Sequence, residues 1–177
     1  APILFGLPPV FGPVHIAFME MVIDPVCSLV FEAEGDERTI MQRPPRKPDQ
    51  PLFSTPLVIW SIMQGLVAFA LVFSVYFYAI IFEMLGADET RALVFFTMVF
   101  VIMGLIFVNR SFSTSLKSAI FRKNAAIPYV VVAVPLMLGI TLLWRPAAEL
   151  FGFGPLHGDD VAMAFGAGIA ALLLIEA

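Results

Sequence analysis

Long apolar segments alternate with short polar ones along this chain. Five segments approach or exceed the about 20 apolar residues that a helix needs to cross a bilayer. They comprise residues 13–31, 56–82, 92–109, 125–144 and 161–177. Because backbone N–H and C=O groups cannot go unpaired in lipid, each segment is expected to form an α-helix. The pattern therefore predicts an all-α membrane protein with about five transmembrane helices.

The polar connections between these segments differ in charge. Eight of the ten basic residues lie in the first and third connections: Arg38, Arg43, Arg46, Lys47, Arg110, Lys117, Arg122 and Lys123. Loops rich in Lys and Arg stay in the cytoplasm. The loop of residues 32–55 is therefore expected to be cytoplasmic, with the first residue outside and the carboxy terminus inside.

Composition supports an embedded protein. Hydrophobic residues make up 60% of the chain and charged residues 14%, against about half and a quarter in soluble domains. Cys27 is the single cysteine, which excludes a disulfide framework or zinc cluster within the chain. Both ends are apolar and the start does not resemble a signal peptide, so the sequence is expected to be part of a longer protein.

Two carboxylates interrupt the first apolar segment. Glu20 and Asp24 stand four residues apart, so both lie on one face of the predicted helix. A charged acid near the bilayer centre costs roughly 3 kcal/mol, and two on one face also repel each other. A cation, a proton or a base from another helix could compensate. No Lys or Arg lies inside the five segments, which favours a cation or a proton; a structural polar pair is the alternative.

Pro25 directly follows Asp24 and is expected to add backbone ligands. A proline within a helix has no N–H for the carbonyl four residues earlier, here that of Met21. The helix is therefore expected to loosen between Met21 and Asp24, so that the carbonyls of Met21 and Val22 become available. Carboxylates beside free carbonyls suit hard cations such as Ca²⁺ or Na⁺. The sequence thus predicts a metal site formed by Glu20, Asp24, Met21 and Val22.

Other polar and small residues favour structural roles. His15 is expected to be solvated at the outer interface, although a part in ion release or proton countertransport stays open. Cys27 is expected to be a small buried residue. Hydrogen bonds between helices are expected from Ser61, Gln64, Thr97 and Asn109. Close helix packing is expected at Gly166, Gly168 and Ala170.

Two segments carry a family resemblance: PVHIAFMEMVIDP at residues 13–25 and TIMQRPPRKPDQPLFS at residues 39–54. With the apolar segments that follow, they resemble the carboxy-terminal transmembrane domain of P-type cation-transporting ATPases, in particular the calcium-pump-like branch with its bacterial members. The resemblance covers nearly the whole chain from about Phe11. The spacing of prolines and arginines in residues 40–52 is its most specific part. It implies helices six to ten of a ten-helix pump in a bacterial plasma membrane.

The resemblance also implies ligand positions. In calcium pumps the sixth membrane helix has an Asn, a Thr and an Asp that bind the ion, and Glu20, Ile23 and Asp24 stand at these positions. Pro25 replaces a glycine. The third segment has no acid where the eighth helix of calcium pumps has a Glu. Ca²⁺ is the transported cation that the resemblance implies first, followed by H⁺, Na⁺ or Mn²⁺.

The family couples phosphorylation of an Asp in a DKTGT motif to alternating access at the membrane site. This sequence contains no DKTGT and no glycine-rich phosphate loop. Actuator, phosphorylation and nucleotide-binding domains are therefore absent from it, and it is not expected to hydrolyse ATP alone. ATP and Mg²⁺ would act only through those domains.

The sequence favours the membrane part of an ATP-driven cation pump. Its expected partners are the lipid bilayer and the remaining helices and cytoplasmic domains of the same pump, with no nucleic acid. A secondary ion transporter or a non-transporting membrane scaffold are the alternatives. A secondary transporter predicts an inverted repeat, and the sequence does not show one.

Overall fold

The computed structural model describes residues 9–34, 53–109 and 124–176, so the basic residues of the two loops that were predicted to be cytoplasmic lie outside the described residues. Regular structure within these ranges is entirely helical: α1 (Pro13–Glu32), α2 (Thr55–Ile81), α3 (Ala87–Asn109), α5 (Ala126–Leu143), α6 (Arg145–Phe151) and α7 (Gly158–Glu176). Five of these helices, all except α6, are long and apolar enough to cross a membrane. The predicted fold class is confirmed for the described part of the chain.

Local residue chemistry sets several helix ends. Pro13 and Pro56 stand in the first turns of α1 and α2, where the missing N–H has no helical partner to lose. Asp88 and Glu89 occupy the first turn of α3, where negative charge opposes the positive end of the helix dipole. For this reason α3 begins at Ala87 instead of residue 92.

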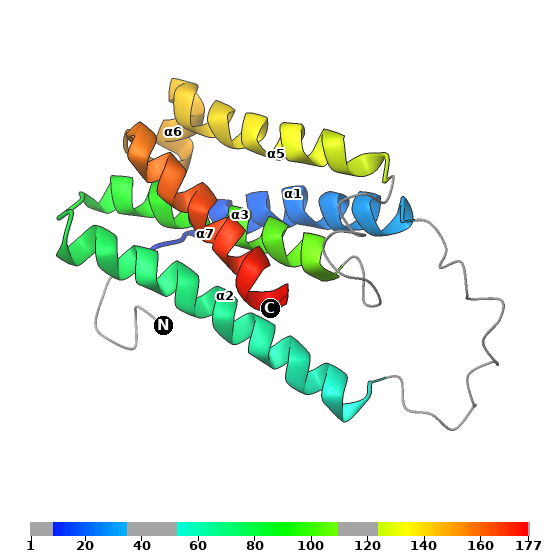
Figure 1. The fold of residues 1–177 in the computed structure, drawn as a ribbon. Coiled ribbons are helices and arrows are strands. Elements are labelled where there is room, and N and C mark those ends of the chain that lie inside the picture. The colour runs from blue at the N-terminus through cyan, green and yellow to red at the C-terminus, as the bar shows by residue number, and fades with distance from the viewer. Residues whose placement is uncertain (1–8, 35–52, 110–123, 177) are drawn as a thin grey trace, which may run out of the picture.

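The short helix α6 was predicted as part of a polar connection. It has a proline in its first turn and ends at Gly152, which adopts a left-handed φ of 59°. Glycine reaches this conformation without the steric cost that other residues meet. The segment 145–151 therefore turns back as a helix beside the end of α5 before the chain enters α7 (Figure 1).

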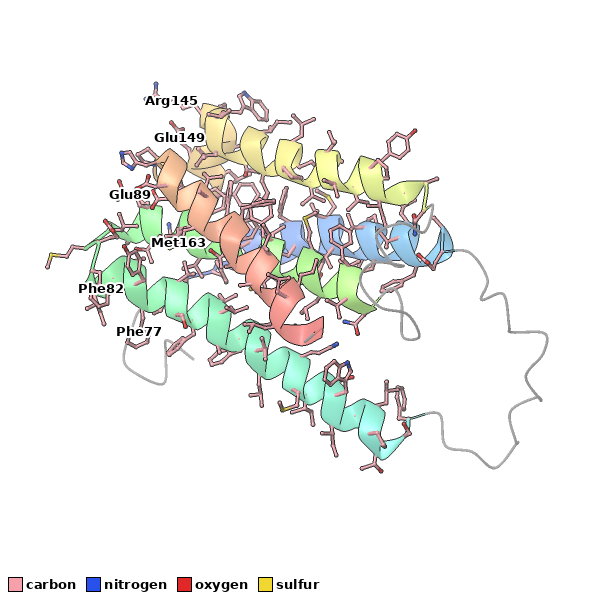
Figure 2. All side chains as sticks on the ribbon, in the orientation of Figure 1. Phe77, Phe82, Glu89, Arg145, Glu149 and Met163 are labelled. Carbon is pink, nitrogen blue, oxygen red and sulfur yellow. The ribbon has the colours of Figure 1, made fainter. Side chains whose placement is uncertain are left out.

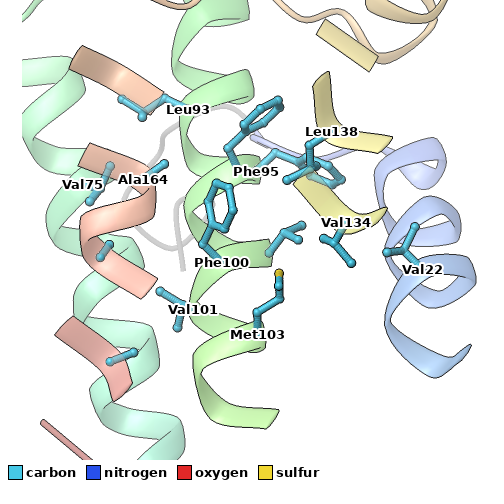
Figure 3. Packing of buried hydrophobic residues seen from close by; sticks show 14 of the residues in the cluster. Val22, Val75, Leu93, Phe95, Phe100, Val101, Met103, Val134, Leu138 and Ala164 are labelled. Carbon is cyan, nitrogen blue, oxygen red and sulfur yellow. The ribbon is translucent and has the colours of Figure 1, made fainter. Parts of the chain in front are cut away.

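α3 is the centre of the bundle. Its spanning window is 67% buried, compared with 17% for α1 and 11% for α2. α7 crosses α3 obliquely and α2 packs against both, while α1 and α5 lie on the other side of α3 (Figures 1 and 3). Figure 3 shows Phe100 and Met103 of α3 in the core between these two sides, with Val134 of α5 and Val22 of α1 beyond them.

α3 and α7 approach most closely at two glycines. A Cβ atom on Gly168 would lie 2.7 Å from the carbonyl oxygen of Phe100, and one on Gly104 would lie 2.7 Å from the carbonyl oxygen of Gly168. The predicted close packing is thus confirmed at Gly168. It is wrong at Gly166, which is exposed with nothing near its missing Cβ. The buried stripe of α7 instead follows helical spacing through Ala164, Ala167, Gly168 and Ala171.

Arg91 ties several segments together at the end of the bundle where α3 begins. Its Nε donates to the carbonyl of Val10 at 3.1 Å, and its Nη1 donates to the carbonyl of Gly152 at 2.6 Å and to Asp88 Oδ1 at 2.8 Å. The chain entering α1 and the end of α6 are therefore held to α3. Glu89, Arg145 and Glu149 gather at the same end (Figure 2). Phe77 of α2 and Phe82, which follows its last residue, point away from the other helices (Figure 2).

Gly152→Ala is expected to destabilise the bundle by about 1–3 kcal/mol, because a non-glycine residue is strained at this φ. The new Cβ would also lie 2.7 Å from Arg91 Nη1. Thermal unfolding of the detergent-solubilised protein measures the effect. Gly158→Ala is the matched control, since nothing lies within 4 Å of its missing Cβ. Equal unfolding temperatures for the two variants would contradict this reading of Gly152.

Candidate cation site

Glu20 and Asp24 lie on an uncovered face of α1. Both side chains are exposed, as are those of Met21 and Pro25. Within the described residues, neither carboxylate has a hydrogen bond or an ion pair. The structure therefore places the two predicted acids on one helix face, as their spacing requires, with no base of the described chain to neutralise them.

The opposite face of α1 fastens the helix to the bundle. Val22 and Val30 are 5% and 0% exposed and belong to the buried core. Val22 points toward Val134 of α5 (Figure 3). The Val22 side chain is thus a packing group, and only its backbone carbonyl is a potential ligand. α1 presents apolar residues to its neighbours and carboxylates to the outside.

The expected loosening at Pro25 is wrong for this structure. α1 runs as one continuous α-helix from Pro13 to Glu32 with Pro25 inside it. A spanning helix tolerates a proline when the hydrogen bonds on either side persist. The carbonyl of Met21 still lacks the donor that a non-proline residue would supply at position 25, so one backbone acceptor stays available one turn before the proline.

The two acids form only part of a metal site. In the described ranges, no group of three or more His, Cys, Asp or Glu residues could hold a metal ion. Hard cations such as Ca²⁺ take six to eight oxygen ligands. A cation held at Glu20 and Asp24 therefore needs further oxygens from groups other than these, and the exposed face of α1 is open to them.

Comparison with known families decides the identity of this bundle. The family described as "Cation transporting ATPase, C-terminus" matches residues 8–177. The chain belongs to this family. The match covers all five spanning helices and the loops between them, so the chain is the carboxy-terminal transmembrane domain of a P-type cation ATPase, an integral multi-pass membrane protein. No curated protein matches the chain in sequence.

His15 of this transmembrane domain is buried, which corrects the expectation that it is solvated. It is 5% exposed, and its Nδ1 accepts the N–H of Gly12 at 3.1 Å. Its Nε2 has no hydrogen-bond partner in the described part of the chain. Four phenylalanine rings lie with centroids 5.4–5.7 Å from the imidazole: Phe11, Phe95, Phe151 and Phe153.

Other polar residues of the transmembrane domain form hydrogen bonds either between two helices or within their own helix. Asn109 Nδ2 donates to Gln64 Oε1 at 3.1 Å, so the predicted hydrogen bond between helices is confirmed for this pair. It is wrong for Ser61 and Thr97, whose hydroxyls donate to carbonyls one turn earlier in their own helices. Cys27 is half-buried.

Proposed function

We propose that this transmembrane domain binds the transported cation through Glu20 and Asp24. One observation supports the proposal above all: two carboxylates without a partner in the described chain share an exposed face of a membrane-spanning helix. Lipid cannot solvate them, and each charge there costs roughly 3 kcal/mol. The face of α1 that bears them is therefore covered by protein, with a cation between the acids and that protein.

Helices of the complete pump outside this chain supply that cover in our proposal. The carbonyl of Met21, which has no helical donor because residue 25 is proline, is a further ligand on the side of α1. Oxygen donors of this kind suit a hard cation, and Ca²⁺ is the first candidate. Access to the site alternates between the two sides of the membrane as ATP-hydrolysing domains of the pump are phosphorylated and dephosphorylated.

The proposed orientation places the start of α1 outside and the end of α7 in the cytoplasm of a bacterial cell. The helices alternate in direction through the bundle (Figure 1), so α1 and α3, which precede the two segments with most of the basic residues, end at the same side of the bundle. That end is cytoplasmic by the distribution of Lys and Arg. The cation is therefore released near the start of α1.

Glu20→Gln in the complete pump is expected to raise the cation concentration for half-maximal uptake by about tenfold, because a neutral amide replaces a charged ligand. ATP-driven uptake into membrane vesicles, measured for Ca²⁺, Mn²⁺ and Na⁺ in turn, identifies the cation and the shift. Glu149→Gln, at the exposed outer end, is the control and should leave uptake unchanged. Uptake driven by an ion gradient without ATP would contradict the proposal.

A further inference from the structure

A buried residue from elsewhere in the chain binds the last turn of α1, at the end that is cytoplasmic in our proposal. Asn124, two residues before the start of α5 at Ala126, is 6% exposed. Its Nδ2 donates to the carbonyl of Val30 at 2.9 Å and to Glu34 Oε2 at 3.0 Å, and its Oδ1 accepts the N–H of Ala126 at 2.9 Å. One buried amide thus joins the last turn of α1 to the first residue of α5.

The carbonyl of Val30 depends on this amide. Carbonyls in the last turn of a helix have no donor within the helix, and α1 ends at Glu32. The N–H of Glu34, four residues on, donates to Phe31 instead. Val30 itself is 0% exposed, so water does not reach this carbonyl readily. Asn124 supplies the donor, and an orphaned carbonyl would follow from its loss.

The contact has consequences for the acids because of where it lies on α1. Val30 is six residues beyond Asp24, about 9 Å along the helix axis. At the other end, α1 is held by the enclosure of His15 and by the bond from Arg91 to Val10. Between these two attachments lies Pro25, where the helix lacks one hydrogen bond. The segment that bears the carboxylates thus lies between two attachments, next to the one position of the helix where proline removes a hydrogen bond.

We propose that Asn124 is a positioning residue for the cation site. By holding Val30 and Ala126 together, it fixes the height and rotation of the part of α1 after Pro25, and with it the place of the Asp24 carboxylate. The inference rests on the function proposed above. It predicts that loss of the Asn124 donor weakens cation binding without removing the ability of the pump to turn over.

Asn124→Asp tests this in the complete pump. Aspartate has nearly the same shape and keeps the acceptor for Ala126, but it cannot donate to Val30. The cation concentration for half-maximal ATPase activation is expected to rise about tenfold, which corresponds to about 1.4 kcal/mol, with maximal turnover within twofold of the unaltered pump. A purely structural role would lower the amount of folded protein and leave this concentration unchanged.

Asn109→Asp is the matched control. Asn109 also donates to a side chain and to a carbonyl, Gln64 Oε1 and Leu105 O. The first contact joins α3 to α2 and the second lies within α3, so neither involves α1. The same substitution there should leave the half-maximal concentration unchanged. An equal shift in both variants would overturn the inference.

Two further variants separate the contact with Val30 from other effects. Asn124→Asp combined with Glu34→Gln removes the repulsion between two carboxylates while Val30 still lacks a donor, so the shift is expected to persist. Its disappearance would overturn the inference. If the aspartate variant does not fold, Asn124→Ser replaces it. Serine introduces no charge, and its side chain is too short to reach the same partners, so the half-maximal cation concentration is expected to rise in this variant too.

Asp24→Asn, measured in parallel, separates the inference from the function on which it rests. Loss of cation activation in Asp24→Asn with unshifted Asn124 variants would overturn the positioning role alone. Intact activation in Asp24→Asn would overturn the cation site itself, and the positioning role with it.

Discussion

Asp24→Asn in the complete pump is expected to reduce cation-activated ATP turnover by at least about a hundredfold, equivalent to about 2.7 kcal/mol. The amide keeps the shape of the side chain and removes the charge that binds the cation in our proposal. Glu20 lies one turn away on the same exposed face of α1, but it is already a ligand in our proposal and therefore does not replace Asp24. Phosphoenzyme formation from ATP at increasing cation concentrations measures the loss.

Glu32→Gln is the control for this prediction. Glu32 is an exposed acid and the last residue of the same helix, eight residues beyond Asp24 and outside the proposed site. It should retain the activation of the unaltered pump. Normal activation in Asp24→Asn, or equal losses in the two variants, would be incompatible with a cation site at Asp24.

Gly168→Leu is expected to separate α7 from α3 and to lower stability by about 3 kcal/mol or more, the upper range for overpacking. Its Cβ would meet the carbonyl oxygen and carbon of Phe100 at 2.7 and 2.9 Å. These are backbone atoms, so neither can move without shifting a whole helix. Thermal denaturation in detergent, followed by size-exclusion chromatography, measures the effect.

Gly166→Leu provides a control on the same helix. Gly166 is exposed and nothing lies within 4 Å of its missing Cβ, so leucine there extends into the surroundings of the bundle. The unfolding temperature should be unchanged or slightly higher. A similar loss for both variants would show that leucine is unfavourable in α7 generally and would contradict the packing account of Gly168.

The sequence predicted the membrane helices well because the cost of unpaired backbone groups in lipid leaves few alternatives. It did not predict which faces meet. Gly166 and Gly168 stand two residues apart, and only contact with Phe100 distinguishes them. Helices that are apolar on all sides carry little information about their partners, so the central place of α3 emerged only from the structure.

The environment of polar residues was predicted unevenly. The pairing of Gln64 with Asn109 follows from the need to satisfy amides in lipid. The burial of His15 was missed because its enclosure comes from Phe95 on α3 and from Phe151 and Phe153, far along the chain. Asn124 and Val30, which form a hydrogen bond, are likewise far apart in the sequence. Contacts of this kind depend on the tertiary arrangement and have no local pattern.

Of the candidate site, the sequence could predict the common face of the two acids. The spacing of Glu20 and Asp24 fixes their common face from the geometry of a helix alone. The effect of Pro25 was overestimated, since α1 stays helical through it. Ligands beyond these acids come, in our account, from helices outside this chain, and no pattern within it could indicate them.

Equilibrium cation binding to the purified complete pump, without ATP, tests the central claim most directly. The unaltered pump is compared with the variant that carries both Glu20→Gln and Asp24→Asn. We predict saturable binding in the first and none above background in the second, at equal amounts of folded protein. The same number of bound cations with the same affinity in both would contradict the claim that these carboxylates hold the transported ion.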